Sequence, residues 1–465
     1  MTNEPDEDTK HEFQYGVPRY VPFEEPDIED ETEVAPFDIP DIEDTPDGLI
    51  KDFLNIVKTD TPEMFKLLTF YHTLSYTLGR FFEYQGMPLN LMVLICSRPH
   101  IGHRSTILDI DYEVRKNAYS KWLKISGAKN TSGAKNTSDY WKGENIMSGT
   151  PEGIADKIKD ATKFKPYIIC LSDGEFGQTL LQYGQQYGIL TLLSRLKYGE
   201  RYAFELATKK ARVIQKGTYM TMLGSMQEPD MYLNESHIRQ GLMRRILVSY
   251  IPSTHFDIDD YIPFTEYGNI KTNVLNRLDK LANRLGELMA KYYSIGLIKT
   301  KKTRRFKPIQ VDFGVSAEKR LNDLDKKRRK QEIKYSDLIS SASMNDTEHL
   351  LILSALTALS RDSIKDNRLY VIDDDVGYAE LILRKLFEQR LNIIWSIGIK
   401  NETFEKNFKL CVDGVKSYIA RYRTKNWEEV QRTFCLSNDV MNEISGYLVK
   451  TQQVEVSKDG IYIKR

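Results

Sequence analysis

The sequence contains no apolar run long enough to cross a membrane, and its beginning lacks the basic and then apolar pattern of a secretory signal. Cysteine is scarce, with four in 465 residues and no CxxC pair, so neither a disulfide framework nor a zinc site is indicated. Hydrophobic residues make up 41% of the chain and charged residues 28%, as in an ordinary soluble protein. We therefore expect a cytoplasmic protein of several domains with no membrane contact.

A net charge of zero hides an uneven distribution of charge along the chain. Residues 1–48 carry 17 acidic and 2 basic side chains, whereas the remaining residues carry 49 acidic and 64 basic ones. A positive body favours a polyanionic partner, and an acidic segment can compete for the same surface. The alternative is that this segment only increases solubility. Because residues 1–48 are also rich in proline, we expect a disordered tail, whose aromatic side chains are candidate docking points for a partner protein.

The most informative stretch is Leu91–Leu108, with the sequence LMVLICSRPHIGHRSTIL. Its first six residues form a continuous apolar run, which is typical of a strand buried on both faces of a parallel sheet. The run breaks at Ser97, reaches a lone glycine at Gly102 and turns polar before a helical pattern begins. Strand, loop, glycine, basic residue, hydroxyl and helix follow one another in the order of a phosphate-binding loop. A strand-to-helix turn without a ligand is the alternative interpretation.

The match to the phosphate-loop pattern G-x-x-x-x-G-K-[ST] is incomplete. Ser97 stands at the first glycine, Gly102 fits the second, and His103 takes the position of the lysine. Arg104 occupies the position expected for the hydroxyl residue, and the first hydroxyl follows one residue later, at Ser105. Histidine is shorter than lysine and mostly neutral at about pH 7, so it is a weaker clamp for phosphate. The candidate nucleotide-binding residues are Ser97, Gly102, His103, Arg104, Ser105 and Thr106, with Ser105 as a candidate magnesium ligand.

Polar side chains also follow the next two predicted strands. Asp173 and Glu175 come after the apolar run Tyr167–Leu171, where a P-loop enzyme keeps its magnesium ligand and the acid that polarises the attacking water. Gln227 follows a third strand at Tyr219–Leu223 and is a candidate sensor of the γ-phosphate. An acidic or polar turn without chemistry is the alternative at each strand end.

Two adjacent arginines precede a fourth predicted strand, Ile246–Tyr250. Arg244 or Arg245 is a candidate arginine finger, which would stabilise the charge that builds on the phosphoryl group held by a neighbouring subunit. Pairing with acidic side chains or with DNA phosphate is the alternative.

Long helical patterns fill the segment 256–400, which is expected to form a helical lid after a helical layer at 49–90 and a core at 91–255. The lid contains basic clusters at Lys299–Lys307 and Lys326–Lys330. These are either solvated helix faces or a track for the phosphate backbone of DNA. The candidate DNA-binding residues are Lys301, Lys302, Arg304, Arg305, Lys326, Lys327, Arg328 and Arg329.

The clearest fold pattern lies in residues 401–465. Three short helical segments precede two alternating strands, which flank a hairpin turn at Lys458–Gly460. Three helices followed by a hairpin predict a winged helix, a domain that often binds DNA through its third helix. That helix carries Asp439 and Glu443 and only one basic residue, Lys450. Binding to another protein is therefore an alternative to the recognition of DNA. The helical segments are 410–422, 426–434 and 437–450.

In their order and spacing, five segments resemble a poorly characterised P-loop family of plasmids, viruses and integrated elements of archaea and bacteria. Members of this family are similar to replicative helicases and to the ATPase halves of primase-helicases. The resemblance covers about residues 46–400. The segments are Pro46–Leu68, SRPHIGHRST (Ser97–Thr106), YIICLSDGEF (Tyr167–Phe176), TYMTMLGSMQEP (Thr218–Pro229) and GLMRRILVSYIP (Gly241–Pro252).

The resemblance implies an α/β fold with a RecA-like or AAA+-like P-loop NTPase core and a parallel sheet, here flanked by helical regions and followed by the winged helix. It implies ATP and Mg²⁺ as cofactors, with Ser105 and Asp173 as metal ligands, and a ring-shaped homo-oligomer. The first hypothesis is an ATP-dependent, helicase-like DNA motor for replication of a mobile element. The second is a non-hydrolysing DNA-binding or scaffold protein that recruits replication partners through its tail or winged helix. His103 favours the second, whereas the retained glycine, acids and arginines favour the first.

Overall fold

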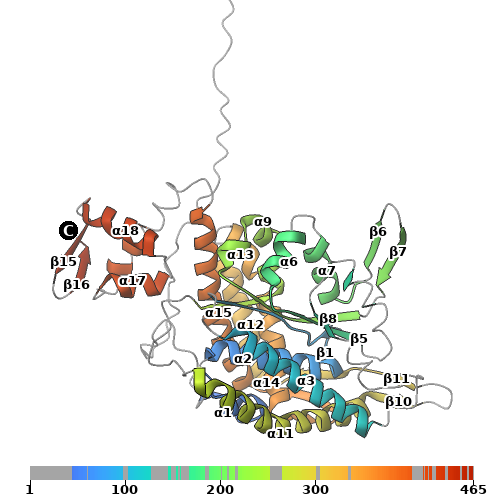
Figure 1. The fold of residues 1–465 in the computed structure, drawn as a ribbon. Helices are drawn as coiled ribbons and strands as arrows, with labels where there is room; N and C mark the ends of the chain where they lie inside the picture. The colour runs from blue at the N-terminus through green and yellow to red at the C-terminus, as the bar shows by residue number, and fades with distance from the viewer. Residues whose placement is uncertain are drawn as a thin grey trace, which may run out of the picture.

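A computed structural model shows the fold of the chain (Figure 1). The tail predicted at residues 1–48 lies almost entirely outside the residues that it describes, as does the segment 98–102. The described residues are 44–59, 61–97, 103–126, 145–147, 153–154, 158, 167–183, 188–200, 202–206, 209–214, 218–251, 264–299, 304–332, 337–400, 412, 414–416, 418–420, 426–434, 438–450, 453–457 and 460–463.

A parallel sheet of five strands forms the centre of the protein. From one edge to the other, the strands are β4 (Asn145–Met147), β5 (Tyr167–Asp173), β8 (Thr218–Met226), β3 (Met92–Ser97) and β9 (Leu247–Ile251). All six residues of β3 are buried, because helices cover both faces of the sheet, and this explains the continuous apolar runs in the sequence. The predicted α/β class and the predicted parallel sheet are confirmed.

One face of this sheet packs against a layer of long helices, drawn below the sheet in Figure 1. Helix α2 lies directly against the sheet and is buried over nearly its whole length, because the other helices of the layer cover its outer side. The layer contains α1 (Leu49–Ile56), α2 (Glu63–Thr77), α3 (Arg104–Ile125), α11 (Phe264–Gly296) and α14 (Asp346–Ser360).

Shorter helices cover the opposite face and form a second hydrophobic core with it, above the sheet in Figure 1. These helices are α6 (Phe176–Tyr183), α7 (Gly188–Lys197), α8 (Pro229–Tyr232), α9 (Glu235–Arg239), α10 (Leu242–Arg245) and α13 (Asp337–Ser343).

Helix α15 (Asp373–Lys400) belongs to both cores. Leu386 packs into the first core, and Ile393, two turns further along, packs into the second. Between them, Oε1 of Gln389 accepts a hydrogen bond from the backbone N–H of Tyr250 at 3.1 Å. The Gln389 side chain therefore satisfies a backbone N–H group on the outer side of β9. The segment predicted to be a lid contains α15 and thus packs against the sheet itself.

A second sheet of five short strands lies beside α14 and combines the segments 49–90 and 256–400. Its β1 and β12 run parallel, with Phe82 opposite Ile309. The prediction that both segments are helical was therefore wrong at these strands, because they are short and the central pairings join residues that are distant in the chain, as Phe82 with Ile309 and Val311 with Leu369. In sheet order the strands are β13 (Ile364–Lys365), β14 (Arg368–Val371), β12 (Ile309–Phe313), β1 (Phe82–Tyr84) and β2 (Met87–Pro88).

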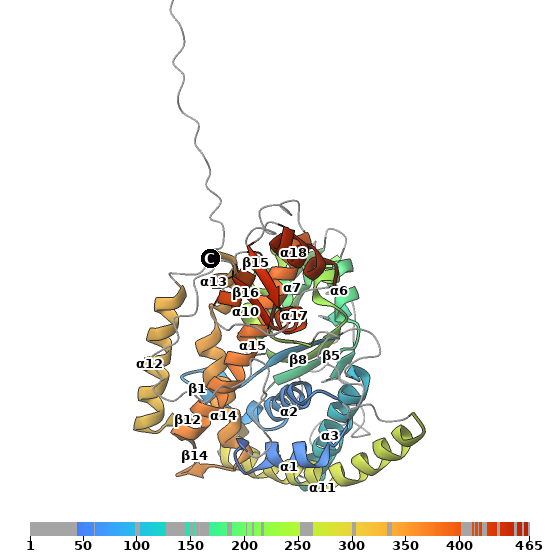
Figure 2. The same ribbon diagram turned by 90° about the vertical axis from the view of Figure 1, so that its left-hand side faces the viewer.

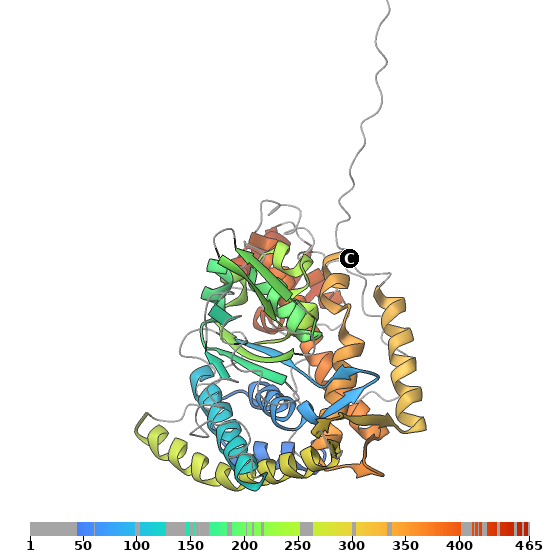
Figure 3. The ribbon, with the colours of Figure 1, turned by 90° about the vertical axis from the view of Figure 1, so that its right-hand side faces the viewer.

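Helix α12 (Val315–Glu332) follows β12 and lies on the outside of the molecule (Figure 2 and Figure 3). The remaining elements of the main body are η2 (Gly79–Phe81) and the antiparallel hairpins β6–β7 (Tyr202–Leu206 and Lys209–Ile214) and β10–β11 (Leu297–Lys299 and Arg304–Phe306).

The C-terminal residues form a small core of their own, in which Val430 and Ile444 are fully buried. Its helices and its hairpin lie where the sequence predicts them, and residues 412, 414–416 and 418–420 are also helical. Within the described ranges, none of the helices combines the length and the hydrophobicity that a membrane span requires. The elements are α17 (Trp427–Phe434), α18 (Asn438–Lys450), β15 (Val454–Ser457) and β16 (Gly460–Ile463).

Candidate functional site

Two neighbouring strands of the parallel sheet lead to opposite faces. β3 leads to α3 on the face that α2 covers, whereas β8 leads to α8, α9 and α10 on the other face. In parallel α/β sheets, ligands bind outside the carboxyl ends of the strands at such a switch point. The predicted phosphate-binding segment follows β3 at this edge. Its glycine, Gly102, lies outside the described residues.

Arg104 is the basic residue that begins α3 at this edge, and it is half-buried. Burial lowers the pKa of its guanidinium, against the opposing effect of Cys96 and of the Glu175 carboxylate. Its Nη1 atom is buried, and among the described residues no acceptor forms a hydrogen bond with it. A half-buried cation with an unsatisfied donor beside a helix N-terminus is a suitable contact for an anion.

The neighbouring residues of the segment differ in their exposure. His103 precedes α3 in the left-handed region, with φ 42°, which residues other than glycine rarely adopt. Ser97 and Thr106 are buried, whereas Ser105 is exposed. The structure therefore leaves Ser105 as the accessible hydroxyl among these three predicted residues.

The acidic turn after β5 lies at the same edge of the sheet. Asp173 is only 2% exposed, and its two carboxylate oxygens accept hydrogen bonds from the Glu175 N–H at 3.0 Å and the Thr179 hydroxyl at 2.7 Å. Asp173 thus stabilises the first turn of α6, whereas the side chain of Glu175 is exposed. The Ser225 hydroxyl donates to the Gly174 carbonyl at 2.6 Å and joins the ends of β5 and β8.

Gln227 follows β8 directly and is half-buried. Three of the predicted groups, at Arg104, at Asp173–Glu175 and at Gln227, are therefore brought to the carboxyl edge of one sheet, as their sequence positions predict.

Arg244 and Arg245 lie at the opposite end of the strands, where the amino ends of the sheet are, because α10 directly precedes β9. Nη1 of Arg245 donates to the carbonyl oxygens of Gln240 at 2.7 Å and Gly241 at 2.9 Å. Nη1 of Arg244 lies 3.4 Å from the sulfur of Met344. Within one subunit these arginines do not meet the acids, so their predicted role as a finger depends on a neighbouring subunit and stays a prediction.

The predicted DNA-binding residues are described only in part. Lys301 and Lys302 lie outside the described residues, and the side chains of Arg304 and Arg305 on β11 are not described either. On α12, the predicted side chains differ in their exposure to solvent. Lys326 is exposed and Lys327 is half-buried.

Arg328 and Arg329 on α12 both contact Asp325, at 3.0 Å and 2.8 Å. Nε of Arg328 also donates to the Thr347 hydroxyl of α14 at 2.8 Å. Arg328 therefore links α12 to α14, whereas Lys326 and Arg329 are exposed to solvent.

A buried polar cluster that the sequence analysis missed lies between α2, α3 and β5. It contains His72, Asp111, Arg115 and Cys170, all at most 1% exposed. Asp111 and Arg115 are four residues apart among apolar positions of α3, and this spacing was the available signal. The partners on α2 and β5 give no such signal, because nothing in the sequence pairs them with α3.

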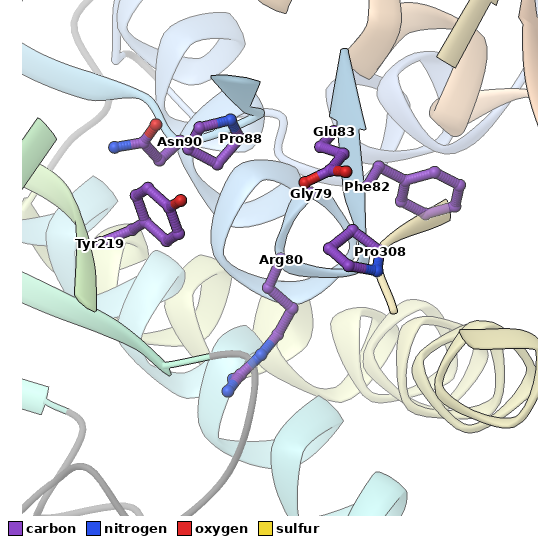
Figure 4. A pocket seen from close by; sticks show the side chains of 8 residues that line it. All are labelled: Gly79, Arg80, Phe82, Glu83, Pro88, Asn90, Tyr219 and Pro308. Carbon is purple, nitrogen blue, oxygen red and sulfur yellow. The ribbon is translucent and has the colours of Figure 1, made fainter. Parts of the chain in front are cut away.

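A hollow of about 60 Å³ lies at the amino edge of the parallel sheet, away from the candidate site. Figure 4 shows Asn90 and Tyr219 on one side of it and Glu83 and Pro308 on the other. A pocket for a drug-sized ligand usually encloses roughly 300 Å³ or more, so this hollow is too small for a nucleotide. The other lining residues are Gly79, Arg80, Phe82 and Pro88.

No protein-family model matches the sequence, and no curated protein matches it at a significant level. Among the described residues, no three His, Cys, Asp or Glu side chains gather in a way that suits a metal ion. The donors at Arg104 fit a phosphate group, whereas both oxygens of Asp173 already serve α6. Magnesium at Ser105 and Asp173 therefore stays a prediction.

Proposed function

We propose that the protein binds a nucleoside triphosphate at the carboxyl edge of its parallel sheet and acts as a helicase-like replication ATPase on DNA. The observation that carries this proposal is the guanidinium of Arg104 at the first residue of α3, whose Nη1 has no hydrogen-bond acceptor among the described residues. The switch point between β3 and β8 supports the same location. The strand order is compatible with the RecA-like core that the resemblance implies.

In this proposal the positive charge comes from Arg104 rather than from His103. The guanidinium and the backbone N–H groups at the start of α3 stabilise the phosphate charge. Glu175 is an exposed carboxylate at the same edge and orients the attacking water. Arg244 or Arg245 of a neighbouring subunit would stabilise charge in a ring, and Lys326 and Arg329 would contact the DNA backbone.

ATP binding to Arg104→Gln tests the proposal directly. We expect the natural protein to bind ATP and the variant to bind about 10-fold more weakly or worse, because one charge-assisted hydrogen bond is lost. Arg368→Gln is the control, since Arg368 is an exposed arginine of β14 that pairs with Asp312 in the second sheet. Absence of ATP binding to the natural protein, or equal binding by both variants, would overturn the nucleotide proposal.

Measuring ATP hydrolysis distinguishes a DNA motor from a non-hydrolysing scaffold protein. If the protein is a motor, DNA stimulates ATP turnover and Glu175→Gln abolishes it while ATP still binds. His103→Lys then measures how far the missing lysine limits the rate. Turnover that persists in Glu175→Gln contradicts the role given to this residue.

A second candidate function is a non-hydrolysing DNA-binding or scaffold protein that recruits replication partners through the tail or the C-terminal helices and hairpin. The engagement of both Asp173 oxygens by Glu175 and Thr179 favours it, because this carboxylate serves the fold. It predicts salt-sensitive DNA binding without ATP turnover, and Lys326→Gln should reduce the salt dependence by about one counterion.

A further inference from the structure

Four ionisable side chains meet in the apolar layer between α2, α3 and β5. Nδ1 of His72 lies 3.1 Å from Oδ1 of Asp111, and Nε2 of the same ring lies 3.5 Å from Sγ of Cys170. Nε of Arg115 donates to Oδ2 of Asp111 at 2.8 Å. All four side chains are at most 1% exposed, so their interactions are with one another and with the protein around them.

The hydrogen bonds determine the role of each atom. Asp111 also accepts from the hydroxyl of Thr73 at 2.7 Å, so its carboxylate is fully engaged as an acceptor. It orients His72 through Nδ1, and only Nε2 of the ring faces the cysteine. Sulfur, imidazole and carboxylate thus stand in the order of a nucleophile, its base and the group that orients the base.

The charges of the cluster favour transfer of the thiol proton to the ring. Arg115 and Asp111 form an ion pair, and a proton that moves from Sγ of Cys170 to Nε2 of His72 leaves the imidazolium beside the Asp111 carboxylate and the thiolate near the Arg115 guanidinium. Arg115 also donates to the hydroxyl of Ser172 at 3.1 Å, and this hydroxyl lies 3.6 Å from the sulfur. A cation and a hydroxyl therefore stand near the sulfur where negative charge would develop.

The pKa values agree with this geometry. Burial by itself would raise the pKa of Cys170, but the charges of Arg115 and His72 outweigh it and the pKa is lowered. Burial would lower the pKa of His72, but Asp111 and Cys170 raise it to about 9. Cys96 on β3 is equally buried, but there burial outweighs the opposing charge of Arg104, so the pKa of Cys96 is raised.

We propose that Cys170 is a modification site, a thiolate that His72 holds ready to react with a small hydroperoxide such as hydrogen peroxide. The sulfur attacks one peroxide oxygen and the O–O bond breaks. The sulfur is oxidised by two electrons to a sulfenic acid, and the departing hydroxide takes the proton of the His72 imidazolium and leaves as water. Hydrogen peroxide has only two heavy atoms, and it reaches the sulfur when the layer opens briefly.

Oxidation at this position would act on the candidate site. Cys170 precedes Asp173 by three residues on β5, and an added oxygen has no room in the packed cluster. Displacing β5 would move Asp173 and the start of α6. This regulatory consequence rests on the proposed nucleotide site, whereas the modification itself does not.

The test treats the full-length, folded protein with hydrogen peroxide and dimedone, which traps sulfenic acids, and follows the labelling of Cys170 and Cys96 by mass spectrometry. Cys96 controls for access, because both cysteines are fully buried. We expect Cys170 to be labelled about 10-fold faster or more, since the thiolate is the nucleophile. Equal labelling of both cysteines, or labelling that requires urea, would overturn the proposal.

His72→Gln should lower the labelling rate of Cys170 to that of Cys96. His349→Gln is the matched control, because His349 is also 0% exposed but belongs to α14, away from the cluster. If His72→Gln does not fold, the comparison of the two cysteines in the natural protein decides the question alone. An unchanged rate in folded His72→Gln would contradict the role of the imidazole. None of these readouts depends on ATP binding.

Discussion

Nη2 of Arg115 donates a hydrogen bond to the hydroxyl of Ser172 at 3.1 Å, deep between α3 and β5. Through this bond, the helix that begins at the candidate anion site is joined to the strand that ends at Asp173. Arg115 also pairs with Asp111 on its own helix at 2.7 Å, and both side chains are buried. The two sides of the proposed nucleotide site are thus connected through the core behind it.

Arg115→Met should destabilise the protein by about 3–5 kcal/mol, because removing one partner leaves the buried carboxylate of Asp111 without its main cation. The free energy of unfolding in urea measures the loss. Lys116→Met is the control on the same helix, where the exposed pair with Glu113 should contribute about 1 kcal/mol or less. Similar losses in the two variants would show that the cluster is not a stabilising element.

Gly241→Ala should destabilise the protein more than Gly86→Ala. Both glycines have φ 83°, so the backbone cost of about 1–2 kcal/mol is shared. A Cβ atom at Gly86 meets nothing within 4 Å, whereas at Gly241 it would collide with the guanidinium groups of Arg244 and Arg245. Displacing Arg245 also breaks its bonds to the carbonyls of Gln240 and Gly241. Thermal unfolding of both variants gives the comparison, and equal losses of stability would contradict the arrangement around Arg245.

Gln389→Leu should cost about 1–3 kcal/mol, because it removes the side-chain oxygen that accepts the hydrogen bond of the Tyr250 N–H at the edge of β9. The Ser249 hydroxyl, at 2.9 Å from the same oxygen, loses its partner as well. Hydrogen exchange at the Tyr250 amide should accelerate. In the control Gln240→Leu, an exposed side-chain bond to Ser236 is lost, and stability should change by less than about 0.5 kcal/mol. Unchanged exchange at Tyr250 would mean that another group covers this edge.

The buried His349 should make stability depend on pH. Its Nε2 lies 3.2 Å from the ammonium of Lys197 and accepts its hydrogen bond, so the ring is held neutral. Burial and the Lys197 charge lower its pKa below the ordinary 6.5, so the unfolded chain binds a proton that the folded protein does not. This contribution is complete above the ordinary value and is lost as pH falls below it.

His349→Gln keeps an acceptor for Lys197 and does not titrate. Between about pH 7 and pH 5, its free energy of unfolding should therefore fall less steeply than that of the natural protein. Parallel pH profiles of the two proteins would exclude His349 as the source of the dependence. Other titrating groups are common to both proteins and cancel in the comparison.

Local pattern was sufficient for part of this fold. The strands around Ile95, Ile169, Met222 and Val248 were recognisable because a strand covered on both faces is apolar at most of its positions. The hairpin around Asp459 was recognisable from its turn residues. The edge of the sheet at which Arg104, Asp173 and Gln227 lie also followed from the sequence, since all parallel strands end on the same side.

Which residues pair with one another, through hydrogen bonds or as neighbouring strands, was decided only by the tertiary structure. Asp173 supports α6, Arg245 binds the carbonyls of its own turn, and the strand at Phe82 pairs with one near Ile309. His72 and Cys170 are 98 positions apart in the chain, yet they meet in one buried cluster. Sequence alone established which segments had to be buried, because burial leaves a periodic apolar pattern. It did not establish which polar groups satisfy one another, because a hydrogen bond between distant residues leaves no local pattern and exists only when packing brings its two atoms together.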